Sequence, residues 1–291
     1  MKRIFGLISL LCFSLSAFAQ SADSVAFISA RRQKLKMGKA EGYTVSVNLF
    51  DAAQTISVVK FSPKNFALEI IQPEEHTKVS IVGEETRAQV AINAGFWNRN
   101  MMPTTFIKSN GAIVAKTYES MVPRVNGVLF MYDNGIEIVE SEDAPDYVSL
   151  ADKCNNCNNI LACGPLLVDN GKMKNYSYIV ESTDPDIKRH TPFFTRRHPR
   201  SAIGCDKEGN IYLMVVDGRV KGQAEGMSIK ELVQLCSWMG LYDALNLDGG
   251  GSSALWSRKY GVISHPCDNR KFDHEGERKV SSTIVAKLRK R

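Results

Sequence analysis

The segment best equipped for chemistry is the run Asn246-Leu-Asp-Gly-Gly-Gly-Ser-Ser253. Its aspartate, Asp248, offers a carboxylate that can act as an acid, a base or a nucleophile. Three glycines follow directly, so backbone amides are bare there, and the two serines add hydroxyl groups. A sugar carrying an anion suits this combination, because backbone amides can hold phosphate oxygens. By its spacing alone, the run is also compatible with a plain glycine-rich turn.

Three further segments carry side chains that suit a sugar or an anion. They are Asn93-Ala-Gly-Phe-Trp97, Cys163-Gly-Pro-Leu166, and the pair formed by Pro199-Arg-Ser-Ala202 with Val216-Asp-Gly-Arg219. Each also has a structural interpretation. Asp217-Gly-Arg219 reads as a turn after a strand, and the aromatic residues after Asn93 read either as core or as a wall for a sugar.

The pattern around these segments is that of strands. Apolar residues alternate with polar ones over 45–49, 56–61 and 66–70, and the continuous apolar run 88–93 indicates a strand buried on both faces. Asn-Gly pairs predict hairpins at Ser109-Asn-Gly111, Asp133-Asn-Gly135 and Asp169-Asn-Gly171.

Few helices are expected. Ser228-Ile-Lys-Glu231 is a capping box, and the apolar face after it predicts a helix that stops at Gly240. Residues 175–200 are polar with three prolines and are expected to form a long loop of the functional kind. The sequence therefore predicts an α+β fold: a single domain with mixed, mainly antiparallel β-sheet and a few packed helices.

The first nineteen residues read as a signal peptide. Lys2 and Arg3 precede an apolar stretch, and Ala17-Phe-Ala19 places small residues before cleavage at Gln20. Residues 20–42 are expected to form an arm or a short helix, and 43–291 the catalytic domain. No later run approaches the ~20 residues of a membrane span. We therefore expect an exported protein, periplasmic or secreted, without stable membrane insertion.

Charge and composition limit the classes of partner that we expect for the protein. Without Lys2 and Arg3, 35 cations face 31 acids, a mild excess spread along the chain. Nucleic-acid binding would require a denser basic face with interleaved aromatics, so no nucleic-acid partner is expected. No phosphate-loop lysine motif or metal-ligand spacing is present, so no cofactor and no metal site are predicted.

Cysteines and histidines leave alternatives open. An even number of cysteines remains after cleavage, compatible with disulfides in an exported protein. Cys154-Asn-Asn-Cys157 could begin a zinc site, but a second ligand pair is missing, which favours a local disulfide or buried thiols. His190, His198, His265 and His274 are expected to be surface or loop residues. The cysteines after the cleavage site are Cys154, Cys157, Cys163, Cys205, Cys236 and Cys267.

Taken together and in order, these segments resemble the phosphodiester glycosidase family, over about residues 88–286. Each is weak alone, and their order and spacing make the resemblance specific. The matching segments are Ile92-Asn-Ala-Gly-Phe96, Gly127-Val-Leu-Phe130, Gly164-Pro-Leu-Leu-Val168, Arg200-Ser-Ala-Ile-Gly204, Val216-Asp-Gly-Arg219, Gly226-Met-Ser-Ile-Lys-Glu-Leu232 and Leu245-Asn-Leu-Asp-Gly-Gly-Gly-Ser-Ser253.

The resemblance implies hydrolysis of a sugar 1-phosphodiester, or of a phosphorylated glycan, at the anomeric carbon. Asp248 would be a catalytic carboxylate, and Asp217 a second carboxylate or an acceptor for a sugar hydroxyl. Asn93 would hold a sugar hydroxyl or N-acetyl group, and Arg200 would pair with the phosphate. The implied substrate-binding residues are Asn93, Arg200, Arg219, Gly249, Gly250, Gly251, Ser252 and Ser253.

One departure concerns the sugar. Relatives carry a serine shortly before the Gly-Met turn, where this chain has Ala224 and Glu225. Two other functions share the same residues: a non-catalytic module that binds phosphorylated glycans or cell-wall polymer, and a hydrolase that cleaves the phosphorus–oxygen bond. Free sugar with a phosphomonoester, binding without turnover, and a sugar phosphate product distinguish the three.

Overall fold

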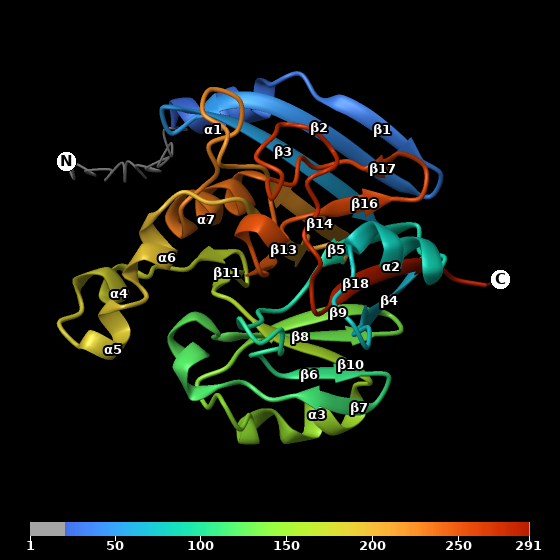
Figure 1. Cartoon of the computed structure of the whole chain (residues 1–291), viewed down its shortest axis with the longest axis vertical. Coiled ribbons are helices and arrows are strands. Elements are labelled where there is room, and N and C mark those ends of the chain that lie inside the picture. The colour runs from blue at the N-terminus through green and yellow to red at the C-terminus, as the bar shows by residue number, and fades with distance from the viewer. Residues whose placement is uncertain (1–20, 291) are drawn as a thin grey trace, which may run out of the picture.

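The computed structural model describes residues 21–290, and the expected signal peptide, residues 1–19, lies outside that range. The described chain folds into three antiparallel sheets with short helices around them (Figure 1). The predicted α+β class with mainly antiparallel sheet is therefore confirmed.

The largest sheet has eight strands and supplies most of the framework for the segments that the sequence singles out for chemistry. Its strands, in spatial order, are β1 (Gln33–Met37), β2 (Ala40–Leu49), β3 (Ala52–Phe61), β14 (Ile211–Val216), β13 (Arg200–Cys205), β15 (Asp243–Asn246), β11 (Leu166–Asp169) and β12 (Lys172–Met173). Strand pairing begins at Gln33, ten residues before the sequence pattern predicts it. The pattern misses β1 because this charged edge strand has no clear alternation.

Two five-stranded sheets complete the molecule. The second sheet holds β7 (Ala112–Ala115), β6 (Ile107–Ser109), β10 (Asn159–Cys163), β8 (Gly127–Tyr132) and β9 (Gly135–Glu140). The third holds β17 (Gly261–Val262), β16 (Leu255–Ser257), β5 (Val90–Asn93), β18 (Thr283–Leu288) and β4 (Phe66–Ile71). The three Asn-Gly hairpins join β6 to β7, β8 to β9 and β11 to β12 as predicted.

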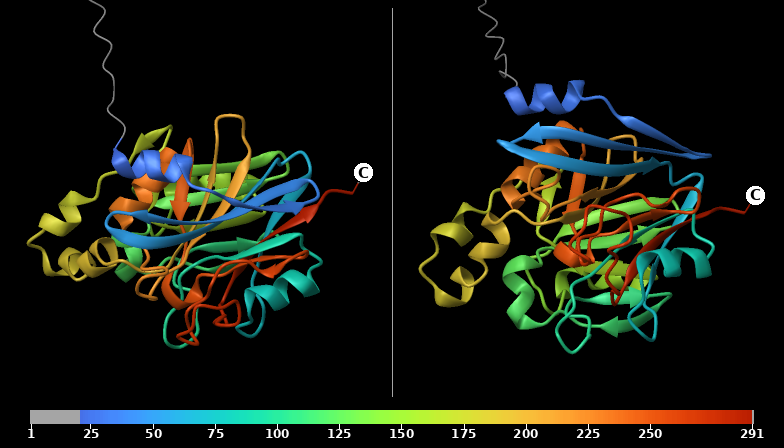
Figure 2. Two further views of the ribbon diagram at one scale, coloured as in Figure 1. Left: turned by 90° about the horizontal axis from the view of Figure 1, so that it is seen from above. Right: turned by 45° about the horizontal axis from the view of Figure 1, so that its top comes forward.

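The helices are short and lie outside the sheets. They are α1 (Ala22–Ser29), α2 (Val79–Glu85), α3 (Ala151–Asn156), α4 (Ser177–Glu181), α5 (Pro185–Lys188), α6 (Thr191–Thr195) and α7 (Ile229–Trp238), with 3-10 turns η1 (Glu119–Arg124), η2 (Val148–Leu150) and η3 (Gly250–Ser252). The views in Figure 2 show α1 lying across β2. The predicted loop 175–200 instead contains α4, α5 and α6, which project from one side of the body (Figure 1).

Both faces of the large sheet are buried, and β3 shows how. Val59 and Phe61 belong to a core shared with the two smaller sheets. Ile56 and Val58, with the opposite parity, belong to a second core under α7. This two-residue period is what a strand buried on both faces requires. The large sheet is therefore the middle layer, and its strand ends are the points where the layers meet.

Helix α7 begins and ends as its sequence predicts. The Ser228 hydroxyl accepts from the Glu231 amide, and the Glu231 carboxylate accepts from the Ser228 amide, which completes the capping box. Gly240, just past the last turn, has φ of +73°. The buried side of α7 faces the large sheet and fixes the chain just before β15.

Within residues 21–290, none of the helices is long and apolar enough to cross a membrane.

Gly204 on β13 tests how closely the strands behind the chemical segments are packed. A Cβ atom at this position would lie 2.6 Å from the main-chain oxygen of Asp243 on β15. Backbone cannot yield as a flexible side chain can, so we expect Gly204→Ala to lower the free energy of unfolding by about 1–3 kcal/mol. Urea denaturation measures this, with the exposed turn variant Glu208→Ala as control. Equal stability of the two variants would contradict the packing described here.

Candidate functional site

Asp248 lies where the first and third sheets meet. β15 ends at Asn246, and the chain continues into the glycine run. The amide of Leu247 donates to the carbonyl of Ser201 at 2.8 Å, and the amide of Asp248 donates to the carbonyl of Ala94 at 2.9 Å. The main chain at Asp248 is therefore held by a strand of the first sheet on one side and by the end of β5 on the other.

The side chain of Asn93 secures this junction. It is fully buried, and its Nδ2 donates to the main-chain oxygen of Asp248 at 2.6 Å. Its Oδ1 accepts from the hydroxyl of Ser201 at 2.7 Å and from the amide of Ala254 at 3.1 Å. Both ends of the amide group are thus occupied by the protein. This differs from the sequence-based expectation of a sugar contact, and it makes Asn93 a residue that positions Asp248.

The glycine amides are less available for phosphate than the sequence predicts. The amide of Gly249 donates to Oδ1 of Asp248 at 2.9 Å, and the amide of Gly250 donates to the carbonyl of Pro199 at 2.8 Å. Two of the three expected donors are therefore satisfied within the protein. A bound anion would need to find most of its partners elsewhere.

Arginine side chains lie beside the glycine run, and the missing Cβ atoms let them approach. A Cβ on Gly250, whose φ is +63°, would lie 2.8 Å from Nη2 of Arg219. A Cβ on Gly251 would collide with the guanidinium group of Arg278. Any side chain here would displace an arginine. The glycine run thus serves chiefly to admit two guanidinium groups beside Asp248.

Arg278 is a site residue that sequence reasoning did not find. It lies on the loop 264–278, which folds back over the glycine run, and it forms a two-pronged ion pair with Asp268. Its Nη2 lies 2.5 Å from Oδ1 and its Nε lies 3.0 Å from Oδ2 of that carboxylate. Nothing in the linear pattern distinguishes Arg278 from other arginines, because its position depends on the path of this loop.

The carboxyl group of Asp248 has an unusual ionisation. Burial raises its pKa from 3.8 to about 6, against the opposing effects of the Ser252 hydroxyl, the Gly249 amide, the Arg278 charge and the Trp97 indole. A carboxylate with this pKa is still mainly ionised at neutral pH, and removing its proton near neutrality costs little. Such a group can serve as a nucleophile, a base or a stabiliser of positive charge.

The two serines after the glycines differ in their surroundings. Oγ of Ser252 accepts from Nε1 of Trp97 at 3.3 Å and lies close enough to Asp248 to affect its pKa. Oγ of Ser253 is buried and has no hydrogen-bond partner in residues 21–290. Of the two predicted contacts, Ser252 is therefore the one placed beside the carboxylate.

Asp217 follows β14 and is 1% exposed. Its Oδ1 accepts from the amide of His265 at 2.8 Å, and its Oδ2 lies 2.8 Å from Nδ1 of the same residue. Burial raises its pKa, and the contacts with His265 oppose the increase. Both carboxylate oxygens are therefore engaged, which leaves Asp217 poorly placed to act as the second catalytic carboxylate or as a sugar acceptor.

Two histidines are more engaged than their expected surface or loop position implies. The ring of His265 pairs with Asp217 as described. His190 lies in a turn, but it is 4% exposed and its Nδ1 accepts from Nε of Arg124 at 2.7 Å. Burial, helped by the Arg124 charge, lowers the pKa of His190 to about 4. His190 is therefore neutral in the folded protein near neutral pH.

Arg200 lies under the site, with its stem against Gly249. It is 1% exposed, and burial lowers its pKa to about 9. Its Nε donates to Met227 O at 2.8 Å, and its Nη2 donates to the carbonyls of Phe193 and Arg196 at 2.8 and 3.0 Å. Only Nη1 is without a protein acceptor in the described chain. The predicted contact with phosphate is therefore limited to that one nitrogen.

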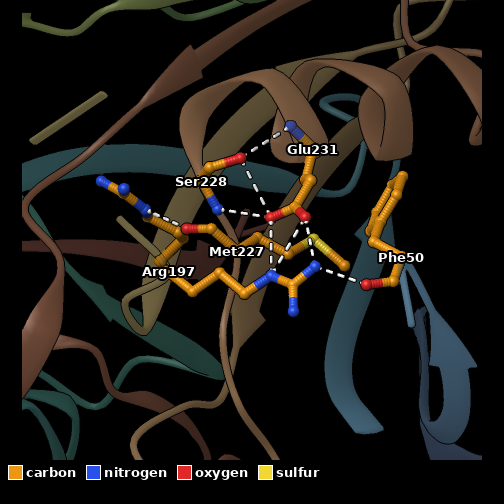
Figure 3. A network of polar contacts seen from close by, with 6 residues as sticks. Phe50, Arg197, Met227, Ser228 and Glu231 are labelled. Carbon is orange, nitrogen blue, oxygen red and sulfur yellow. Dashed lines mark hydrogen bonds and ion pairs between the residues drawn. The ribbon is translucent and has the colours of Figure 1, made fainter. Parts of the chain in front are cut away.

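A polar network around the start of α7 holds the segment that contains Arg200 (Figure 3). Nη2 and Nε of Arg197 contact Oε1 of Glu231 at 2.6 and 3.0 Å, and Nη2 also donates to the carbonyl of Phe50. Glu231 in turn caps α7 through Ser228. The network ties the β2–β3 hairpin, α7 and the start of β13 together, so that Pro199 and Arg200 are fixed against the glycine run.

No group of three or more metal-ligating side chains converges within residues 21–290. The cysteines expected to form disulfides, zinc ligands or buried thiols are all free, and all but Cys154 are buried. Cys267 lies at the site, where its Sγ is 3.7 Å from Nη1 of Arg219 and 3.9 Å from the carbonyl of Gly250.

Three hollows of the described chain lie away from these residues. One of about 730 Å³ lies between α1, β1 and β2, and one of about 700 Å³ lies beside α4 and α7. A third of about 400 Å³ reaches Phe272 on the loop 264–278. The site is therefore identified by its converging charges and its ionisation.

The chain is similar in sequence to known proteins. The family model described as phosphodiester glycosidase matches residues 86–287. The SPbeta prophage-derived uncharacterized protein YomE of Bacillus subtilis strain 168 is 27% identical over 172 residues, which are 59% of this chain and 24% of that protein. The chain thus spans about a quarter of the length of that curated relative.

Two solved structures share the fold. A hypothetical protein from Synechocystis superposes with a TM-score of 0.69 at 18% identity, covering 89% of this chain and 64% of that one. The zebrafish N-acetylglucosamine-1-phosphodiester alpha-N-acetylglucosaminidase catalytic domain, auto-inhibited by its pro-peptide, gives 0.68 at 16% identity, covering 93% and 94%.

A measurement of stability without ligand distinguishes a positioning role of Asn93 from a contact with substrate. Asn93→Ala leaves the Ser201 hydroxyl, the Ala254 amide and the Asp248 carbonyl without their partner, so we expect the free energy of unfolding to fall by about 2–4 kcal/mol. Chemical denaturation without any ligand measures the loss, with exposed Asn100→Ala as control. A variant as stable as the wild type would show that the amide does not hold the junction.

The raised pKa of Asp248 predicts that replacing its carboxyl group increases the stability of the fold, by an amount that depends on pH. The folded protein binds this proton more tightly than the unfolded chain, so the carboxyl group costs stability as pH rises from about 4 through about 6. We expect Asp248→Asn to be more stable than the wild type at pH 8, by up to about 3 kcal/mol, and similar to it below pH 4. Urea denaturation at both values tests this, with surface Asp152→Asn as control. A pH-independent difference would contradict it.

Proposed function

The chain belongs to the phosphodiester glycosidase family, and on that premise we propose that it hydrolyses a sugar 1-phosphodiester at the anomeric carbon and releases free sugar and a phosphomonoester. The main support is the placement of Asp248, a carboxylate with a pKa of about 6, beside a glycine run that two guanidinium groups approach. A carboxylate next to fixed positive charge suits a substrate whose reacting carbon is attached to phosphate.

The arginines suit the leaving group. A phosphodiester needs little protonation to leave, so charge neutralisation is the most useful contribution of the protein. Arg219 and Arg278 stand against Gly250 and Gly251 and can supply it, because a guanidinium fork matches phosphate oxygens. Arg278 is held in place by Asp268, so it is already oriented before substrate arrives.

Asp248 suits the other side of the breaking bond. Cleavage at an anomeric carbon develops positive charge on the sugar ring, and a nearby carboxylate stabilises that charge or bonds to the carbon. Its main chain is fixed by Asn93 and Ala94, and its Oδ1 accepts from the Gly249 amide. The carboxylate is therefore held in one orientation at the site.

Two further parts of the proposal concern the sugar and the location. We propose N-acetylglucosamine as the first sugar to test, because the zebrafish structure of the same fold bears that name. We also propose an exported protein acting on phosphorylated glycans, on the basis of the basic, apolar and small-residue pattern of residues 1–19.

The decisive experiment follows the bond that breaks. The wild type is incubated with N-acetylglucosamine, glucose and mannose 1-phosphodiesters in ¹⁸O-water, and products are identified by mass spectrometry. We expect free sugar carrying ¹⁸O and an unlabelled phosphomonoester. Label in phosphate with a sugar phosphate product would indicate cleavage at phosphorus, and binding without turnover would indicate a recognition module. Either outcome would overturn the proposal.

Asp248→Asn should be assayed in parallel. We expect its kcat to fall by a factor on the order of 10²–10⁴, since the amide can neither stabilise positive charge nor bond to carbon as a carboxylate does. Asp152→Asn on α3 is the matched control and should retain wild-type turnover. Wild-type turnover by Asp248→Asn would remove this residue from the mechanism.

A further inference from the structure

The ring of His265 is held in a defined tautomer by Asp217. When ionised, the carboxylate of Asp217 only accepts hydrogen bonds, and Nδ1 of His265 lies 2.8 Å from its Oδ2. Nδ1 therefore carries the proton in the neutral ring, and the lone pair lies on Nε2. Nε2 has no hydrogen-bond partner in the part of the chain that the structure describes.

Aromatic neighbours restrict the rotation of this ring. Phe272 stacks on it with centroids 4.0 Å apart and planes 8° apart, and His274 packs at 4.3 Å. His274 is itself fixed, since its Nδ1 lies 2.7 Å from the carbonyl of Ser264. The side chain of His265 nevertheless keeps 15% of its surface exposed. His265 is thus a partly accessible imidazole with little freedom to turn.

His265 lies in the loop 264–278, which reaches the glycine run of the proposed site. It is two residues from Cys267, whose Sγ contacts both Arg219 and the carbonyl of Gly250. The same loop carries Arg278 against Gly251. The imidazole therefore belongs to the segment that brings the anion-binding arginines to the glycine run.

Where Asp248 bonds to the anomeric carbon or stabilises its positive charge, hydrolysis needs a second group that takes a proton from water. Asp217, which the sequence offers for this task, is 1% exposed and has both oxygens bonded to His265. A buried carboxylate that orients a histidine is a familiar arrangement for making an imidazole a base. The need for a base and the free nitrogen therefore coincide at His265.

We propose that His265 is the general base of the reaction and that Asp217 is its positioning residue, an inference that rests on the proposed function. Nε2 accepts one proton from water while the water oxygen bonds to the anomeric carbon. The bond from that carbon to its leaving oxygen breaks, and the electron pair stays on that oxygen. The leaving oxygen belongs to phosphate in a single displacement and to Asp248 in a double one. The proton then passes from Nε2 to solvent.

Azide distinguishes a base from a structural residue, because it attacks carbon without losing a proton. We expect His265→Ala to lower kcat by a factor on the order of 10²–10⁴ with little change in KM. Azide should restore turnover and yield a glycosyl azide. Lys271→Ala, at an exposed position of the same loop that does not contact the ring of His265, is the control and should keep most of its activity without azide.

Each outcome bears on the assignment. Wild-type kcat in His265→Ala, or a loss that azide does not restore, would overturn it. If His265→Ala proves unfolded by circular dichroism, long-range ¹H–¹⁵N spectra of the wild type decide instead, because a ring protonated on Nε2 and bare on Nδ1 would exclude the proposed base. Wild-type protein that fails to turn over any diester would instead refute the proposed function itself, and His265 as its base with it.

Discussion

The site depends on one buried amide group. Asn93 ends a strand of the third sheet, yet its side chain bonds to Ser201 of the first sheet, to the carbonyl of Asp248 and to the amide of Ala254. A buried amide is tolerated only when both its ends are satisfied, so these four segments must come together for the fold to be stable. The position of the Asp248 main chain is therefore a condition of folding.

A second constraint is steric. Glycine is commonly valued for its bare amides, but here the amides of Gly249 and Gly250 are bonded within the protein. What a side chain would remove is the space that Arg219 and Arg278 occupy. The carboxylate before three glycines therefore identified the correct position of the site. The physical reason for the glycines, however, is that they let arginines come close. A side chain in place of these glycines would displace the arginine charges by steric contact.

Local sequence patterns correctly predicted the features that depend only on residues close together in the chain. The Asn-Gly turns, the strand alternation and the capping box at Ser228 each determine a structure within a few residues, and each is present. Helices α4 to α6 were missed because they are only four or five residues long, and because α5 and α6 each carry a proline in a segment that reads as a loop. The partners of Asp217 and the position of Arg278 could not be predicted, since both depend on how the loop 264–278 returns across the sheet.

The two buried aspartates illustrate how environment divides labour between like groups. Burial raises the pKa of both, but both oxygens of Asp217 bond to one histidine, while the carboxylate of Asp248 lies beside a serine, a glycine amide and arginine charge. A carboxylate that is almost fully buried and bonded through both oxygens can orient a neighbour but is not open to a ligand. Asp217, predicted from the sequence as a second carboxylate or an acceptor for a sugar hydroxyl, is thus better understood as a support for an imidazole, and Asp248 as the reactive carboxylate. The loop that supplies the imidazole also supplies an arginine, so in the proposed reaction a single segment would bring both the proton acceptor and part of the phosphate site to Asp248.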